Sequence, residues 1–162
     1  MRNGNHDIQL RPTVASDLEK LFQIQLNREA IFLAAFNSQD PTDKPAYFAK
    51  YTRLLSDPTV NNQTIIVGET IVGSIAKFLM EGDAEITYWL DRDFWGQGIA
   101  TAALKNFLGI ETIRPLFGRV AFDNFGSQRV LEKCGFTRIG SDRGFANARQ
   151  MEIEEFIYRL DV

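Results

Sequence analysis

The sequence predicts a single α/β domain in which a meander of strands lies among helices. Three observations support this class. The segments 64–67, 71–80 and 84–90 follow one another with only short turns between them, as the strands of a meander do. Residues 18–24 carry apolar side chains at helical spacing. The chain has 162 residues, 44% of them hydrophobic, which suits one globular domain with a substantial core.

The N-terminal part of the chain is predicted to form one strand and three helices. Residues 8–11 alternate between apolar and polar side chains, which favours a strand. Ser16 and Glu19 fit a capping box at the start of the next helix. A short apolar helix over 29–36 follows, and then a helix from 42 to about 56 that an Asp-Pro pair ends.

The aromatic residues on the last two of these helices have two interpretations. They either pack in the core against the sheet or line one wall of a substrate site. They are Phe32, Phe36, Tyr47, Phe48 and Tyr51.

The stretch 84–108 is the most informative part of the sequence. Its first segment, 84–90, alternates between two faces as a strand does, and its last segment, 102–108, reads as a helix. Between them Gly96 and Gly98 lie where a loop becomes a helix N-terminus. Unpaired backbone N–H groups and the helix dipole favour an anion there, typically a phosphate.

Two well-known phosphate sites do not fit these residues. A P-loop requires a Lys directly after its last Gly, and no Lys follows Gly96 or Gly98. A dinucleotide fingerprint requires a third Gly where Thr101 stands, and a series of parallel βαβ units that is not indicated here. The sequence therefore predicts a phosphate cradle of another kind.

The C-terminal part of the chain is predicted to add strands and one helix to the domain. A short strand at 118–122 precedes a helix at 124–133. Strands at 136–139 and 150–160 complete the chain. The adjacent glutamates at 154–155 upset the alternation of the last strand and predict a bulge or a sheet edge.

Three blocks, in order along the chain, carry a resemblance to a known family. They are Leu10–Pro12 with Asp17, Glu85–Leu90 with Trp95–Thr101, and Asn124 and Ser127 with Val130–Phe136. The chain resembles the GNAT superfamily of N-acetyltransferases, in the RimJ/RimL-like branch that contains ribosomal-protein N-terminal acetyltransferases and many small-molecule acetyltransferases. The resemblance implies one N-acetyltransferase domain over 1–162, with a mixed, mostly antiparallel central sheet flanked by helices.

The resemblance also implies the activity and the co-substrate. Such enzymes move the acetyl group of acetyl-CoA directly to a primary amine, which is a protein or peptide N-terminus or a small molecule, and need no metal. The expected cofactor-binding residues lie at the end of the central strand, in the glycine loop and on the following helices. They are Trp89, Leu90, Trp95, Gly96, Gln97, Gly98, Ile99, Ala100, Thr101, Asn124 and Ser127.

The resemblance also implies which part of the co-substrate two sets of these residues would contact. Backbone N–H groups of the loop 95–101 would take the pyrophosphate, although Trp95 stands where the family usually has Gln or Arg. A backbone N–H near the end of the central strand, at Trp89, Leu90 or Asp91, would bind the developing oxyanion. Asn124 is also a favoured N-cap residue, so helix capping is its alternative role.

Glu85 is the candidate catalytic base. A carboxylate in a central strand is costly unless it is paired, hydrated or functional, and burial would raise its pKa. Some members of the resembled family place a catalytic Glu here, while a paired structural Glu and a water chain stay open as alternatives. The acid for the leaving thiolate is unassigned, because Leu131 stands where the family often has a Tyr. Candidate substitutes are Ser127, Tyr88, Tyr158 and water.

The charge and composition of the chain limit the classes of partner that it can have. The net charge of −3 argues against a general nucleic-acid binder. No apolar run is long enough for a membrane span, and residues 1–7 are interpreted as a polar, flexible leader, so we expect a cytoplasmic protein. We expect it to be a monomer or a homodimer.

The single cysteine, Cys134, excludes an intrachain disulfide and makes a cysteine metal site improbable. Acidic residues around the central strand would suit a cationic amine, with a solvated acidic loop as the alternative; they are Glu81, Asp83, Glu85, Asp91 and Asp93.

Two alternative functions compete with this prediction. The missing Tyr and the uncertain base favour a non-catalytic acyl-CoA binding or sensing module. A nicotinamide-dependent enzyme would instead bind a dinucleotide in preference to coenzyme A.

Overall fold

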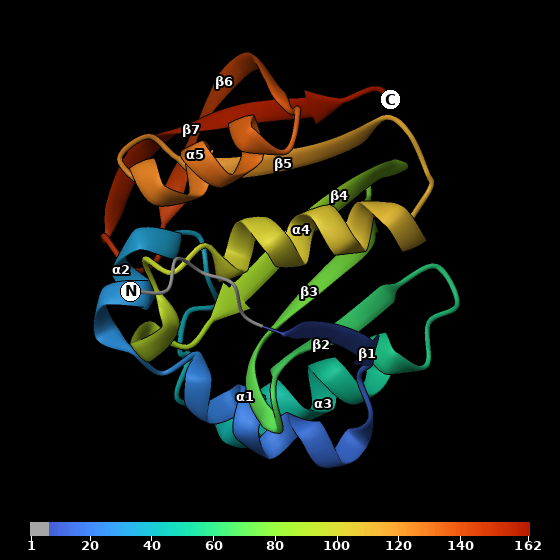
Figure 1. Ribbon diagram of the computed structural model, residues 1–162. Coiled ribbons are helices and arrows are strands. Elements are labelled where there is room, and N and C mark those ends of the chain that lie inside the picture. Colours follow the sequence, from blue (N-terminus) through green and yellow to red (C-terminus); the bar gives the residue numbers. More distant parts are fainter. Residues whose placement is uncertain (1–6) are drawn as a thin grey trace.

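The computed structural model describes residues 7–162, whose strands form one seven-stranded sheet in the order β1-β2-β3-β4-β5-β7-β6 (Figure 1). The strands are β1 (Ile8–Pro12), β2 (Asn61–Val67), β3 (Thr70–Met80), β4 (Asp83–Leu90), β5 (Leu116–Ala121), β6 (Thr137–Ala146) and β7 (Met151–Leu160). All neighbouring strands are antiparallel except the pair β4 and β5, which is parallel. The predicted mixed, mostly antiparallel sheet is confirmed. Most of the predicted leader, residues 1–6, lies outside the described residues.

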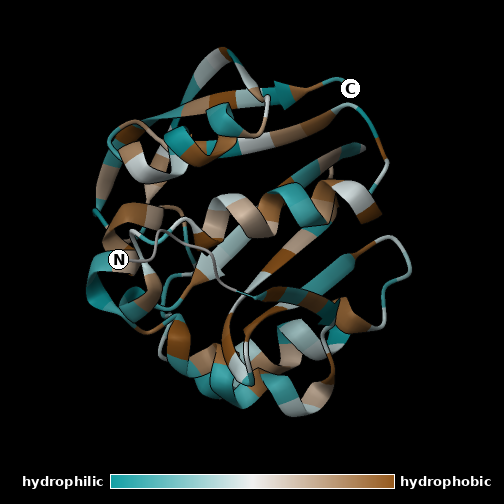
Figure 2. Cartoon of the chain, in the orientation of Figure 1, coloured by the Kyte–Doolittle hydropathy of each residue, from teal (hydrophilic) through white to brown (hydrophobic). Residues whose placement is uncertain are grey.

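Helices flank the sheet on both faces. They are α1 (Leu18–Ile24), α2 (Arg28–Ala34), α3 (Lys44–Leu55), α4 (Ile99–Ile110) and α5 (Phe125–Lys133), with short 3-10 turns at Ala15–Asp17 and Arg92–Phe94. In Figure 1, α4 and α5 lie across one face of the sheet, while α1 and α3 lie together beside the β1–β3 half. Figure 2 shows α4 and α5 as alternating hydrophobic and hydrophilic bands, because each buries one stripe against the sheet.

The aromatic side chains of α2 and α3 divide between three environments. Tyr47 and Phe48 pack with Phe22 of α1, with the Phe22 and Tyr47 ring centroids 5.1 Å apart, and Tyr51 packs against Tyr47. Phe36 packs against a small buried cluster formed by Ala35, Ala121, Ala146 and Ile153, whereas Phe32 is 50% exposed. None of these aromatic side chains lines the cavity between β4 and β5. The α3 residues are half-buried and pack on α1, so the predicted packing against the sheet holds only for Phe36.

The start of α1 differs from the predicted capping box. Ser16 lies within the 3-10 turn before α1, and the carboxylate of Glu19 binds Lys44 of α3 instead of capping the helix. The Asp17 carboxylate accepts two hydrogen bonds from Arg11, at 2.7 and 2.8 Å. Arg11 holds the pKa of Asp17 below its usual range. Asp17 also accepts the Val14 N–H at 2.9 Å, so Asp17 closes the first turn in place of the predicted pair Ser16 and Glu19.

The predicted bulge at residues 154–155 is wrong. The register of β6 and β7 shifts at 138–140 of β6, and β7 lies between β5 and β6 and is therefore not an edge. Glu154 stands opposite Arg143, and Glu155 accepts a hydrogen bond from Arg119 at 3.1 Å. Because basic residues of the neighbouring strands face both glutamates, the strand continues without a break.

The parallel pairing between β4 and β5 is short. Only Ala84–Ile86 of β4 pairs with Leu116–Gly118 of β5. Beyond this point β4 continues along β3, and β5 continues along β7. The two halves of the sheet therefore diverge, and the backbone of β4 beyond Ile86 has no partner on its β5 side.

A substitution at Gly73 tests how closely β3 and β4 approach each other next to the point where β4 and β5 diverge. A Cβ atom at Gly73 would lie 2.1 Å from the Trp89 carbonyl oxygen, so Gly73→Ala should lower the free energy of unfolding by about 1–3 kcal/mol in urea titrations. Gly109→Ala in α4 is the matched control, because its Cβ meets no atom within 4 Å and alanine favours a helix. Equal stability of the two variants would contradict the close approach.

Candidate active site

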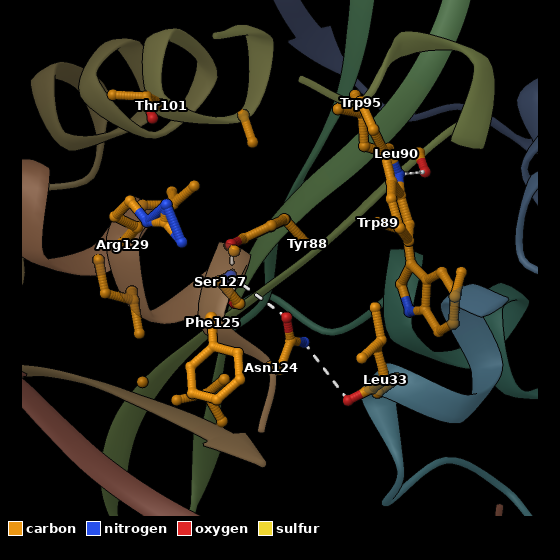
Figure 3. Close-up of a pocket in the computed structure, with 18 of the residues that line it drawn as sticks. Leu33, Tyr88, Trp89, Leu90, Trp95, Thr101, Asn124, Phe125, Ser127 and Arg129 are labelled. Atoms are coloured by element: carbon orange, nitrogen blue, oxygen red, sulfur yellow. Dashed lines mark hydrogen bonds between the residues drawn. The ribbon is translucent and has the colours of Figure 1, made fainter. Parts of the chain in front are cut away.

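A cavity of about 750 Å³ opens where β4 and β5 diverge (Figure 3). Its walls come from α2, the end of β4, the loop before α4, the first turn of α4, β5 and α5. The cavity therefore has the helix N-terminus of α4 at one side and α2 at another. Of the predicted cofactor-binding residues, all but Gln97 line it.

The glycine loop has the shape of an anion cradle. Gly96 and Gly98 have φ values of 76° and 80°, in the left-handed region that favours glycine. Gly98 is the N-cap of α4 and contributes no capping side chain, so the N–H groups of the following turn have no acceptor within the helix. Both glycines line the cavity, and no atom of residues 7–162 lies within 4 Å of a Cβ built at either one, so the cradle is open to an anion.

Trp95 anchors this loop to the central strand. Its indole N–H donates to the Leu90 carbonyl oxygen at 2.9 Å, and the Arg92 guanidinium lies 4.6 Å from the centroid of its ring (Figure 3). A Trp here therefore stabilises the loop through its side chain and leaves the backbone N–H groups of the cradle in place. Gln97 is half-buried, does not line the cavity, and donates to the Asp93 carbonyl oxygen at 3.3 Å.

The end of β4 presents backbone donors to the cavity. The Asp91 N–H donates to the Val72 carbonyl oxygen of β3 at 2.7 Å. Because N–H groups alternate between the two sides of an antiparallel strand, the Trp89 N–H also points toward β3. The N–H groups of Tyr88 and Leu90 point the other way, toward the gap that β5 leaves. Leu90 is thus the predicted oxyanion position whose N–H faces the cavity.

Asn124 both caps α5 and ties it to α2. Its side-chain oxygen accepts the Ser127 N–H at 3.2 Å, and its side-chain NH₂ donates to the Leu33 carbonyl oxygen at 3.3 Å (Figure 3). Helix capping, the alternative role predicted from the sequence, is therefore present in the structure. Asn124 and Ser127 also line the cavity, so capping and ligand contact are compatible.

The structure brings together two of the predicted proton donors. The hydroxyls of Tyr88 and Ser127 are 2.8 Å apart on the cavity wall. Burial raises the pKa of Tyr88 to about 12, so its hydroxyl stays protonated at neutral pH. Tyr158 instead donates to Glu132 at 2.9 Å and does not line the cavity. Leu131, at the position of the missing family Tyr, is buried in the core.

Glu85 is buried and ion-paired behind the cavity wall. It is 6% exposed, and its carboxylate accepts from the Arg119 guanidinium at 3.3 Å. Burial raises the pKa of Glu85, and the charge of Arg119 opposes this rise. Arg119 also binds Glu155 at 3.1 Å and lies 3.8 Å from Asp142. Arg119 lines the cavity, whereas Glu85 does not.

Sequence reasoning missed Arg119 and Glu155. Arg119 lies on β5, beside β4, and Glu155 lies on β7, on the far side of β5, so their approach to Glu85 depends on the sheet order; no motif marks either residue. The predicted acidic cluster is also corrected by the strand geometry. Glu81 and Asp83 lie at or before the start of β4, and Asp91 and Asp93 lie beyond its end, so these acids do not form one group.

Two basic residues of α5, Arg129 and Lys133, line the cavity. Cys134 follows them outside the cavity lining, with its sulfur 3.7 Å from the Thr101 carbonyl oxygen, and burial raises the pKa of its thiol.

Within residues 7–162, no three His, Cys, Asp or Glu side chains are grouped so that they could hold a metal ion. Over the same residues, no helix combines the length and hydrophobicity that crossing a bilayer requires.

Comparison with protein families gives one match that covers most of the chain. Residues 7–137 match the family model described as Acetyltransferase (GNAT) domain. No curated protein matches the sequence significantly.

Solved structures share the fold over nearly the full chain. RimL, a ribosomal L7/L12 alpha-N-protein acetyltransferase in complex with coenzyme A, is 20% identical with a TM-score of 0.81, and the match covers 99% of this chain and 97% of RimL. Mycobacterium smegmatis RimJ, in complex with CoA-disulfide, is 19% identical with a TM-score of 0.79, over 100% and 90% of the two chains. The microcin C7 self-immunity acetyltransferase MccE, in complex with acetyl-CoA and AMP, is 21% identical with a TM-score of 0.78, over 98% and 94%. At these identities the likeness establishes a common fold.

Gly98 provides a test of the anion cradle. Gly98→Trp should weaken binding of acetyl-CoA by about a hundredfold or more in calorimetric titrations, because the side chain would enter the space in front of the N–H groups. Gly82→Trp is the matched control, since Gly82 has the same left-handed conformation, at φ 88°, and equally open surroundings in the turn between β3 and β4. Unchanged affinity of Gly98→Trp, with both variants folded, would refute the placement of the phosphates.

Proposed function

We propose that this chain, which belongs to the GNAT acetyltransferase family and so transfers acetyl groups from acetyl-CoA to amines, performs this transfer directly in the cavity between β4 and β5. One observation carries the proposal: the cavity joins the anion cradle of α4 to the outward-facing N–H groups at the end of β4. Neither a cysteine nor a histidine of residues 7–162 lines the cavity, which favours a direct transfer over a covalent enzyme intermediate.

The cradle would hold the pyrophosphate of the co-substrate. The N–H groups of Gly98 and the first turn of α4 would donate to the phosphate oxygens. Arg129 and Lys133 of α5 are placed to contact the remaining phosphates of the adenosine end. Asn124 and Ser127 would contact the pantetheine arm from the other wall. When bound, the co-substrate supplies the activated thioester.

The end of β4 would stabilise the transition state. As the amine nitrogen attacks the thioester carbonyl, negative charge develops on the carbonyl oxygen, and the Leu90 N–H would donate to it. Because this N–H is already fixed within the strand, it needs no reorganisation during the reaction.

Tyr88 and Ser127 would stabilise the departing sulfur by hydrogen bonding. The pKa of Tyr88 is about 12, whereas an ordinary thiol has a pKa of about 8.5, so complete proton transfer from Tyr88 to the thiolate is unfavourable. The pair therefore serves as a hydrogen-bond donor, and solvent supplies the proton. This role substitutes for the Tyr that Leu131 replaces.

Glu85 is the proposed base, acting on the amine through water. Its raised pKa favours proton uptake, and Arg119, which donates to its carboxylate, lines the cavity. Arg119 keeps Glu85 from being an unpaired buried charge, which the fold would otherwise not tolerate.

The proposed acceptor is a primary amine at a protein or peptide N-terminus, with a small-molecule amine as the other class. Support comes from the fold shared with RimL and RimJ. RimL is described as a ribosomal L7/L12 alpha-N-protein acetyltransferase. The proposed enzyme is cytoplasmic, acts as a monomer or homodimer, and has no nucleic-acid or membrane partner. Its net charge of −3 supports the absence of a nucleic-acid partner.

A second candidate function is a non-catalytic acyl-CoA binding or sensing module. Leu131 at the position of the family Tyr, and the placement of Glu85 behind Arg119, favour it. Such a module would bind acetyl-CoA without turnover.

Calorimetric titration with acetyl-CoA, with NAD and ATP as controls, is the first test. We expect selective binding of acetyl-CoA, followed by release of free coenzyme A thiol when N-terminal peptides or polyamines are added. Binding without thiol release for any amine would support the sensing module. Preference for NAD would contradict the family-based reading of the cradle.

Glu85→Gln tests the base. A base is needed where the amine is mostly protonated, so turnover should fall by roughly a hundredfold on the acidic side of the pH profile and much less on the alkaline side. The wild type should lose activity as pH falls through the raised pKa of Glu85, because the protonated carboxyl cannot accept a proton. Glu154→Gln, on β7, two strands away from β4, should leave the profile unchanged. An equal loss at every pH would indicate a structural role for Glu85.

A further inference from the structure

The turn between β6 and β7, residues 147–150, contacts two walls of the cavity without lining it. We propose that Arg149 in this turn is a positioning residue that fixes α2 against the start of α5, and that it thereby sets the affinity for the acceptor amine. The kinetic part of this proposal rests on the proposed acetyltransferase function, whereas the positioning part does not.

The helix α2 needs support from outside itself. Ala30, Leu33 and Ala34 of α2 line the cavity, but the helix has only seven residues, a length that is marginal without tertiary contacts. It ends at Ala35, which has φ 64° and ψ −51°, a strained conformation for a residue with a side chain. The Phe36 N–H closes this tight turn by donating to the Ala34 carbonyl oxygen at 2.6 Å. Neighbouring structure must hold such a conformation in place.

The β6–β7 turn supplies that support. Three of its donors bind carbonyl oxygens in the last turn of α2 or just after it. The bonds run from the Ala148 N–H to Ala35 at 3.1 Å, from the Asn147 side chain to Asn37 at 2.9 Å, and from Arg149 Nε to Phe32 at 2.8 Å. Helix carbonyl groups that lack intrahelical donors are thereby satisfied.

Arg149 extends this contact to the other wall. Its two terminal nitrogens donate to the Asp123 carboxylate at 3.0 and 2.8 Å, and its guanidinium lies 3.8 Å from the centroid of the Phe32 ring. The Arg149 side chain is 6% exposed, so water competes little for these bonds. Asp123 lines the cavity and directly precedes Asn124, the N-cap of α5. One guanidinium therefore spans from α2 to the start of α5.

The position of Arg149 predicts which substrate it affects. The anion cradle at 95–101 belongs to α4 and its preceding loop, which Arg149 does not contact. Asn124 provides one further link between the two walls, through Leu33, and its bond is longer, at 3.3 Å. The cradle and α5 would hold acetyl-CoA, which leaves α2 as the wall that faces the acceptor amine. Loss of Arg149 should therefore displace this acceptor wall and leave the cradle intact.

The test compares Arg149→Gln with Arg159→Gln. Arg159 lies on the adjoining β7 and makes an exposed ion pair with Asp161 at 3.0 Å, so it controls for the loss of a paired arginine. In Arg149→Gln we expect amide hydrogen exchange in α2 to speed up by about tenfold or more, with acetyl-CoA affinity changed by less than about threefold. With a peptide whose N-terminus the wild type acetylates, the acceptor KM should rise by about tenfold while kcat changes little. Arg159→Gln should match the wild type in all of these measurements.

Arg149→Lys keeps the charge beside Asp123 but loses the planar fork, so we expect an intermediate exchange rate and KM. This variant also preserves the test if the Gln variant does not fold. Unchanged α2 exchange in a folded variant would overturn the proposal, as would a fall in kcat or in acetyl-CoA affinity without a rise in acceptor KM. Since hydrogen exchange requires no turnover, it decides the positioning role even if no amine proves to be a substrate.

Discussion

The brief parallel pairing of β4 with β5 is the constraint on which the site depends. Three residue pairs hold the two halves of the sheet together, and beyond Ile86 each strand keeps only its antiparallel neighbour. A longer ladder would satisfy the N–H groups of Tyr88 and Leu90 and close the cavity. Because the pairing stops, backbone donors and the start of α4 are exposed to a common space.

The walls of this space are stabilised by arginine residues that themselves do little chemistry. Arg119 neutralises Glu85 and Glu155 below one wall, and Arg149 joins the α2 wall to Asp123. In both cases a guanidinium binds a carboxylate from another element in a partly or largely buried setting, where such bonds are strong and unpaired charges are costly. The site thus depends on charge pairs between elements that are distant in sequence.

The sequence predicted the elements well where local patterns are strong. The hairpin of β2 and β3, the central strand β4 and the cradle at Gly96 and Gly98 follow from alternation and glycine placement, and all are present. It failed where long-range partners override local signals: Glu19 pairs with Lys44 of α3 instead of completing the predicted capping box, and basic neighbours keep β7 regular at Glu154 and Glu155. Boundaries also moved, since β6 continues to Ala146 instead of ending near 139.

What the sequence by itself determined is the chemistry of short segments: a loop of glycines before a helix, an Asn that caps the next helix, and a family resemblance carried by contiguous motifs. Only the tertiary structure decided which residues meet. The 2.8 Å contact between Tyr88 and Ser127, the placement of Arg119 before Glu85, and the bridge from Arg149 to Asp123 each join residues at least 26 positions apart. Such contacts depend on strand order and register, which no local pattern encodes.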